Sequence, residues 1–159
     1  MKFFGLLLFL AASIAWGNSQ QKAFNKTMYY KVMSSEDLNA INNQLTLLKE
    51  TSLNEKEAYE GTLLMKKAGL ITNPKEKLNF FRTGRLKLEA CIKKDSLNGE
   101  LYFLRLIIQE HAPKIMNYSS EIKKDSEYIE RSYKNMPTVV REAIIDYSKK
   151  SKVLKIKEN

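Results

Sequence analysis

Residues 98–113, NGELYFLRLIIQEHAP, decide the fold of this chain. Leu101, Leu104, Ile107 and Ile108 cover most of the circumference of a helix, which Pro113 brings to an end. A helix that is apolar nearly all round is buried among other helices rather than lying on a surface. The segment therefore predicts the central helix of a helical domain.

Helix signals recur on both sides of this segment, whereas strand signals are nearly absent. The expected helices span residues 34–50, 54–69, 73–95, 98–113, 119–135 and 136 to about 150. The expected start and stop residues are Ser34 or Ser35, Gly69, Asn73 with Pro74, and Ser119 or Ser120. Because short turns join antiparallel neighbours, we predict an all-α antiparallel bundle, a short array of helical hairpins with about six helices.

The first seventeen residues, MKFFGLLLFLAASIAWG, have the pattern of a secretory signal peptide. Lys2 precedes an uncharged run that ends in small residues, and this run is short for a membrane span of about 20 residues. We expect cleavage after Gly17, with Ala15 as the alternative and an uncleaved anchor as a further one. No cysteine follows the run, so we expect an exported, periplasmic or secreted protein without a lipid anchor.

We predict that the rest of the chain divides into three parts. Residues 18–33 form an arm or a first short helix, residues 34–150 a single α-helical domain, and residues 151–159 a basic tail. Cys91 is the only cysteine and has no partner within the chain, so apolar packing must hold the domain together.

The junction between two expected helices resembles the boundary between two tetratricopeptide repeats. Gly84, Leu88, Cys91, Ser96 and Tyr102 fall at the spacings of the small, large apolar and aromatic residues of that family, although Ser96 replaces a proline. The resemblance implies tetratricopeptide-like helix pairs, which stack to leave a concave face and bind extended partners.

A second resemblance covers roughly residues 55–130. The segments AYEGTLLMKKAG, KEKLNFFRTGRLKLEACI and ELYFLRLIIQEHAPKIMNY are similar to a group of small exported helical proteins of Bacteroidota. This group carries no assigned activity, so the resemblance implies export and a helical fold alone.

A polar stripe on the central helix is the main candidate site. Tyr102, Arg105 and Gln109 are spaced by three and four residues and therefore share one face. A buried arginine needs a carboxylate partner, and the candidates on neighbouring helices are Glu57, Glu60 and Glu89. We expect an internal polar clamp between helices, or a groove in which Tyr102, Arg105 and Gln109 bind a peptide. A solvated stripe is the third interpretation.

Catalytic and metal chemistry find little support in the sequence. The single histidine, His111, lies at a helix end and forms no metal-ligand set with Cys91. No nucleophile motif accompanies it. We therefore expect no metal and no cofactor, and keep an envelope hydrolase using His111 or Glu110 as the enzymatic alternative.

The formal net charge is +9, and lysines are spread over the whole chain. The C-terminal stretch KKSKVLKIKEN, residues 149–159, carries five lysines around an apolar centre: Lys149, Lys150, Lys152, Lys155 and Lys157. We expect this stretch to be the solvated end of the last helix, with contact to an anionic membrane surface as the alternative. Because the protein is expected to be exported, we expect no nucleic-acid partner. The sequence as a whole favours a non-enzymatic protein- or peptide-binding or scaffolding module of the cell envelope.

Overall fold

The computed structural model describes residues 24–156, so the predicted signal peptide lies outside the described residues. Within this range the chain forms seven α-helices and two short 3-10 helices, and no strand. The prediction of an all-α fold is therefore confirmed. None of the helices in the described range is long and apolar enough to cross a membrane.

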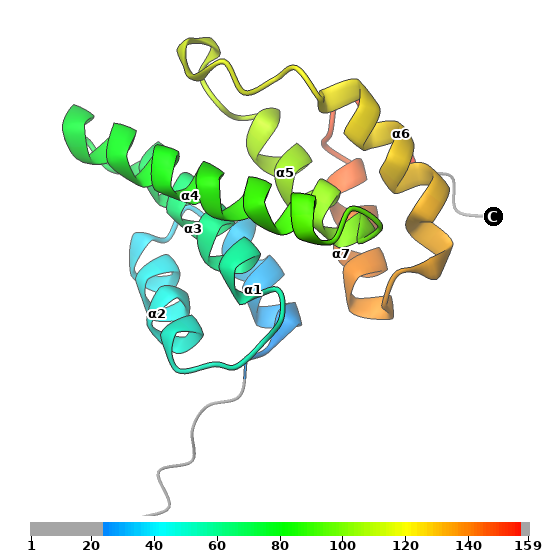
Figure 1. Ribbon diagram of the computed structural model, residues 1–159, viewed down its shortest axis with the longest axis horizontal. Coiled ribbons are helices and arrows are strands. Elements are labelled where there is room, and N and C mark those ends of the chain that lie inside the picture. Colours follow the sequence, from blue (N-terminus) through cyan, green and yellow to red (C-terminus); the bar gives the residue numbers. More distant parts are fainter. Residues whose placement is uncertain (1–23, 157–159) are drawn as a thin grey trace, which may run out of the picture.

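The first four helices are α1 (Lys26–Met33), α2 (Leu38–Lys49), α3 (Lys56–Leu70) and α4 (Pro74–Lys94). They are followed by α5 (Gly99–Gln109), η1 (Lys114–Met116), α6 (Ile122–Ser132), η2 (Tyr133–Asn135) and α7 (Thr138–Ser148). In Figure 1 the long helix α4 runs across α3 and α5. The helix α2 lies at one side of the molecule and α6 at the other, and α1 packs against α7 between them.

The helix boundaries show which sequence signals operate. Asn73 caps α4, its side chain accepting hydrogen bonds from the Lys75 and Glu76 amides, and Pro74 occupies the first helical position. The predicted cap of α2 was wrong, because Asp37 takes this role instead of Ser34 or Ser35. A carboxylate is the stronger partner for the free amides and for the positive end of the helix dipole.

Two further predicted boundaries were wrong. Gly69 lies inside α3, which continues to Leu70, and has no positive φ. The cap of α6 is Glu121 rather than Ser119 or Ser120, and it makes no side-chain capping bond. Neither helix therefore ends or begins with the local signal expected from the sequence.

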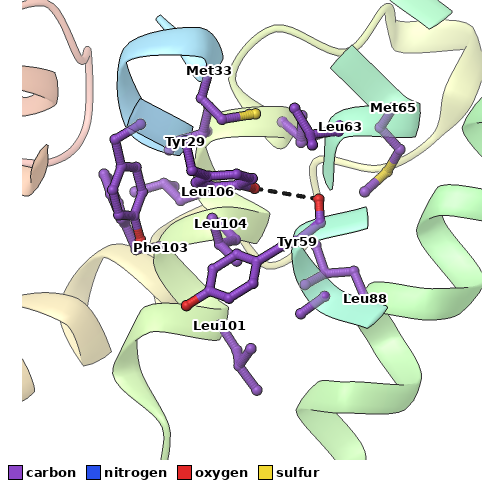
Figure 2. Packing of buried hydrophobic residues seen from close by; sticks show 14 of the residues in the cluster. Tyr29, Met33, Tyr59, Leu63, Met65, Leu88, Leu101, Phe103, Leu104 and Leu106 are labelled. Carbon is purple, nitrogen blue, oxygen red and sulfur yellow. Dashed lines mark hydrogen bonds between the residues drawn. The ribbon is translucent and has the colours of Figure 1, made fainter. Parts of the chain in front are cut away.

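The core is built around α5, where all residues except Tyr102 are buried. Helix α1 contributes Tyr29, Tyr30, Val32 and Met33 to the same core. Figure 2 shows the Tyr29 hydroxyl directed at the Tyr59 carbonyl oxygen, at 3.5 Å, among apolar side chains of α3, α4 and α5. The short helix at the N-terminal end of the described chain is thus packed into the domain.

The tightest contact between helices is the crossing of α3 and α4 at Gly61 and Gly84. A Cβ atom added at Gly61 would lie 2.6 Å from the Gly84 carbonyl oxygen, and one at Gly84 would collide with the Gly61 carbonyl oxygen. Only glycine allows the two backbones to approach this closely. Backbone therefore contacts backbone along this helix pair.

The segment after α7 folds back onto the domain instead of continuing as a helix. Ser151 donates a hydrogen bond to Glu110 at 2.7 Å and accepts the amide of Leu154 at 2.9 Å. The Leu154 side chain is fully buried. Leu154, a residue of the expected basic tail, therefore belongs to the core of the domain.

Candidate functional site

A cleft of about 760 Å³ opens between α1, α3, α5, α7 and the start of α4. This volume lies within the range of pockets that bind small molecules or apolar side chains. Its walls are formed by residues from six separate segments, the sixth being η1 with Met116. The cleft is therefore a product of the tertiary fold.

The floor of the cleft is apolar and buried. It is formed by Met33 from α1, Met65 from α3, and Phe103, Ile107 and Ile108 from α5. Two of these five side chains are methionines, which are flexible and adapt to irregular apolar partners. Such a floor suits an apolar group of variable shape.

The rim of the cleft carries charges of both signs. Its basic residues are Lys31, Lys66, Lys77 and Lys150, its acidic residues are Glu36, Glu142 and Asp146, and His111 lies beside them. Asp146 forms an ion pair with Lys149 at 2.7 Å.

Lys66 is half-buried in the cleft wall. Burial lowers the pKa of its ammonium group; Glu36 opposes this shift and Lys150 reinforces it. Burial in an apolar wall disfavours the charged form, and a second cation nearby does the same. Lys66 is thus a cation held in an unfavourable setting.

The predicted polar stripe lies elsewhere. Arg105 is buried and donates to both carboxylate oxygens of Asp125, from Nε at 2.7 Å and Nη2 at 2.6 Å, and from Nη1 to Glu89 at 2.9 Å. The Tyr118 hydroxyl donates to the other oxygen of Glu89 at 2.6 Å. Arg105 thereby joins α4, α5 and α6 in the manner of the predicted internal clamp.

Of the three predicted carboxylate partners of Arg105, only Glu89 contacts it. Glu57 and Glu60 bond Lys87 instead, the second at 3.2 Å. The close crossing of α3 and α4 places Lys87 beside Gly61, and so in front of these two acids. The main partner, Asp125, was not among the predicted residues. The available sequence signal was its position in the amphipathic helix that follows the helix of Arg105.

The two other residues of the stripe have separate surroundings. The Tyr102 hydroxyl donates to the Ser96 carbonyl at 2.9 Å, and its ring packs on Tyr128 with 4.4 Å between centroids. Gln109 is buried, and its side-chain oxygen has no hydrogen-bond partner among the described residues. Tyr102, Arg105 and Gln109 are all absent from the lining of the cleft.

Glu100 forms a second buried polar cluster that sequence reasoning missed. One carboxylate oxygen accepts the hydroxyls of Tyr30 at 2.7 Å and Tyr59 at 2.8 Å, and the other accepts Lys26 at 2.7 Å. Burial and the Glu100 charge raise the pKa of both tyrosines above their ordinary value. The cluster fixes α1 to α3 and α5, and thereby positions one wall of the cleft.

The candidate catalytic residues have structural partners. His111 lies on the rim of the cleft, where its Nδ1 bonds the Ile107 carbonyl at 2.8 Å. Glu110 accepts hydrogen bonds from Tyr147, Ser151 and the Lys152 amide, at 2.8, 2.7 and 2.9 Å. Glu110 therefore anchors the folded-back C-terminal segment.

Residues suited to metal binding do not cluster within the described range. No three His, Cys, Asp or Glu side chains there are close enough to hold a metal ion. Burial raises the pKa of the Cys91 thiol, so the reactive thiolate form is disfavoured.

Comparison with known proteins adds no identification. The chain matches no protein family, and neither the curated proteins nor the solved structures contain a match to it. The resemblances to tetratricopeptide repeats and to exported Bacteroidota proteins therefore stay predictions.

Proposed function

We propose that this is an exported, non-enzymatic binding protein of the cell envelope, and that its cleft holds the apolar side chains of a peptide or partner protein. The observation that carries the proposal is the cleft itself, which combines a buried apolar floor with a charged rim. Export is supported by the order of charged, apolar and small residues in positions 1–17.

The chemistry of the cleft favours a peptide over a wholly apolar ligand. An amphipathic peptide places apolar side chains in a groove and polar ones at its edge, as in helix-in-groove recognition. The floor residues Met33, Met65 and Phe103 match the first requirement, and the rim charges Lys31 and Glu142 match the second.

We further propose that α3 with α4, and α5 with α6, are tetratricopeptide-like pairs. The support is the Gly61–Gly84 crossing, because small residues at helix crossings of this kind permit close stacking. Stacked pairs leave concave surfaces that bind extended partners.

The cleft can be blocked by a single substitution at Gly69. This residue is exposed, lines the cleft, and an added Cβ would meet no atom within 4 Å. Gly69→Trp should therefore place an indole in the cleft mouth without disturbing the core. Asn79→Trp is a matched control, since Asn79 is exposed on α4 and does not line the cleft.

The test is a peptide-display selection on the mature protein, followed by affinity measurement. Selected peptides should share apolar residues at helical spacing. Their affinity for the Gly69→Trp protein should be at least about tenfold lower than for the wild type, a loss of roughly 1.4 kcal/mol. Their affinity for the Asn79→Trp protein should equal that for the wild type. Failure to enrich any peptide, or equal binding to the Gly69→Trp protein, would refute the proposal.

A further inference from the structure

The outward side of α4 carries a row of basic and apolar side chains: Lys75, Leu78, Arg82, Leu86 and Lys93. They are separated by three, four, four and seven residues, so they lie in one line along the helix. All five are exposed. Because α4 lies across α3 and α5 (Figure 1), this line forms part of the outer surface of the molecule, and we call it the α4 face.

The positive charges of the α4 face are not neutralised within the described part of the chain. Its two lysines and its arginine form no ion pair there. Glu89 lies near the same line, but its carboxylate already accepts Arg105 at 2.9 Å and Tyr118 at 2.6 Å. Glu76, the other acidic residue of α4, lies on the flank of the helix, about 100° round from Lys75. The face therefore attracts anions.

Leu86 distinguishes the α4 face from an ordinary solvated basic surface. Its side chain is 74% exposed, and no large apolar residue in the described α-helices is more exposed. Leu78 is exposed on the same line, two turns earlier. Transfer of leucine from water to acyl chains is favourable, whereas the phosphate backbone of a nucleic acid gives it no apolar partner. Cations that attract anionic lipids and apolar side chains that enter the headgroup region are the two contributions to binding at a membrane surface.

The position of α4 suits it to contact a flat surface. The helix has 21 residues and is therefore about 30 Å long, with Lys75 and Lys93 near its two ends. Its opposite side is braced by α3 through the Gly61–Gly84 crossing. No residue of the α4 face lines the cleft, so a surface bound to this face leaves the cleft lining free.

We propose that the α4 face docks the protein on a lipid surface that contains anionic headgroups. Lys75, Arg82 and Lys93 lie at the headgroups, while Leu78 and Leu86 enter the interface between headgroups and acyl chains. This is a second binding surface, and it does not depend on the function proposed for the cleft.

Sedimentation with lipid vesicles measures the docking. The mature protein should bind vesicles of equal parts phosphatidylglycerol and phosphatidylcholine, more weakly as salt is added, and should not bind vesicles of phosphatidylcholine alone. Combining Lys75→Gln, Arg82→Gln and Lys93→Gln should weaken binding to the mixed vesicles by about a hundredfold, since each basic residue at an anionic surface contributes roughly fivefold. Equal binding to the two kinds of vesicle would overturn the proposal.

The matched control removes the same charges from another part of the surface. Lys123→Gln, Arg131→Gln and Lys134→Gln also remove two lysines and one arginine, all exposed and none in an ion pair among the described residues. This variant should lose less than about fivefold. An equal loss in both triple variants would show that net charge attracts the protein to lipid, and the α4 face would be refuted.

Fluorescence tests directly whether the apolar residues enter the lipid. The mature chain expected after cleavage at Gly17 has no tryptophan, because Trp16 lies within the predicted signal peptide. The emission of a Leu86→Trp protein should shift to shorter wavelength on the mixed vesicles and be quenched by brominated lipid. Leu53→Trp is the control, because Leu53 is exposed between α2 and α3 and away from α4, and its emission should not shift. An unshifted emission of the Leu86→Trp protein would overturn the proposal.

Two further results distinguish lipid from other anionic partners and the α4 face from the cleft. Leu78→Ser combined with Leu86→Ser should weaken vesicle binding by about tenfold. If this variant binds the vesicles as the wild type does, and duplex DNA or polyglutamate is bound equally well, the lipid assignment is wrong. The Gly69→Trp protein should bind vesicles as tightly as the wild type, so failure of the cleft leaves the α4 face untouched, and the reverse.

Discussion

Buried charges at single residues hold the helices of this protein in register. Arg105, Asp125 and Glu89 come from three helices, and every bond between them is 2.9 Å or shorter. A paired buried charge adds little net stability, because desolvation offsets the attraction, whereas an unpaired one costs several kcal/mol. We therefore expect the clamp to contribute mainly by fixing how α4, α5 and α6 pack against one another.

Asp125→Ala should therefore strongly destabilise the fold. It leaves the buried guanidinium of Arg105 with Glu89 as its one remaining carboxylate among the described residues, and we expect a loss of about 3 to 5 kcal/mol in the free energy of unfolding. Urea unfolding followed by circular dichroism measures this loss.

The matched control removes both charges together. Arg105→Met combined with Asp125→Leu should recover most of the stability, because no unpaired charge is left in the core. A double variant as unstable as the single one would show that the clamp contributes by more than charge pairing.

The buried tyrosine hydroxyls should make the protein sensitive to alkali. Burial is the main cause that raises the pKa of Tyr29, Tyr30, Tyr59, Tyr118 and Tyr147 above the ordinary value of 10.0. The unfolded chain releases these protons near pH 10 while the folded protein keeps them. These tyrosines therefore cause no loss of stability below pH 10, and the free energy of unfolding declines as the pH rises above 10.

Near-ultraviolet absorbance during a pH titration checks this expectation. The five tyrosines should ionise only as the protein unfolds. Tyr147→Phe removes one of the five groups and should make the alkaline decline in stability shallower. Ionisation of these tyrosines in a still-folded protein would contradict the burial seen here.

At the scale of helices, Gly84 is crowded by a neighbouring helix and Gly69 is not, so substitution by alanine should change stability in opposite directions at the two sites. Gly84→Ala should destabilise the protein by about 1 to 3 kcal/mol, because its methyl group collides with the α3 backbone. Gly69→Ala should stabilise it by about 0.5 to 1 kcal/mol, since the added methyl meets no atom and alanine favours a helix. Thermal unfolding of both variants measures the difference, and a shared sign would contradict the described α3–α4 crossing.

Sequence patterns were sufficient to predict that the chain is helical, but they did not predict several of the helix ends. The apolar stripes and the Asn73–Pro74 pair are local signals, so α4 begins where expected. Gly69 lies inside α3, by contrast, although a glycine near the end of an apolar stripe commonly marks the end of a helix. An apolar residue within a helix is not always in the core: Leu78, in the first turn and a half of α4, is 38% exposed.

For the molecule as a whole, the C-terminal segment should be part of the folding unit. Truncation after Lys150 removes Leu154 from the core and leaves Glu110 without Ser151 and the Lys152 amide. We expect a loss of at least about 1.5 to 3 kcal/mol from the burial of Leu154 alone. Truncation after Ile156 is the control and should leave the thermal midpoint unchanged.

The candidate site could be predicted only in part. The partnership of Arg105 with Glu89 follows from the need of a buried arginine for a carboxylate, a rule that applies to sequence alone. The cleft could not be predicted, since its lining comes from six segments whose approach depends on helix crossing angles.

The Gly61–Gly84 crossing also makes the two sides of the cleft mechanically unequal. The α3 side is braced backbone to backbone by α4, whereas the α1 and α7 side is held by side chains and by the Glu100 cluster. We therefore expect opening motions of the cleft to involve α1 and α7 more than α3 and α4. A ligand should slow amide hydrogen exchange in those two helices and leave α3 and α4 unaltered, so the entropic cost of binding falls on one side of the molecule.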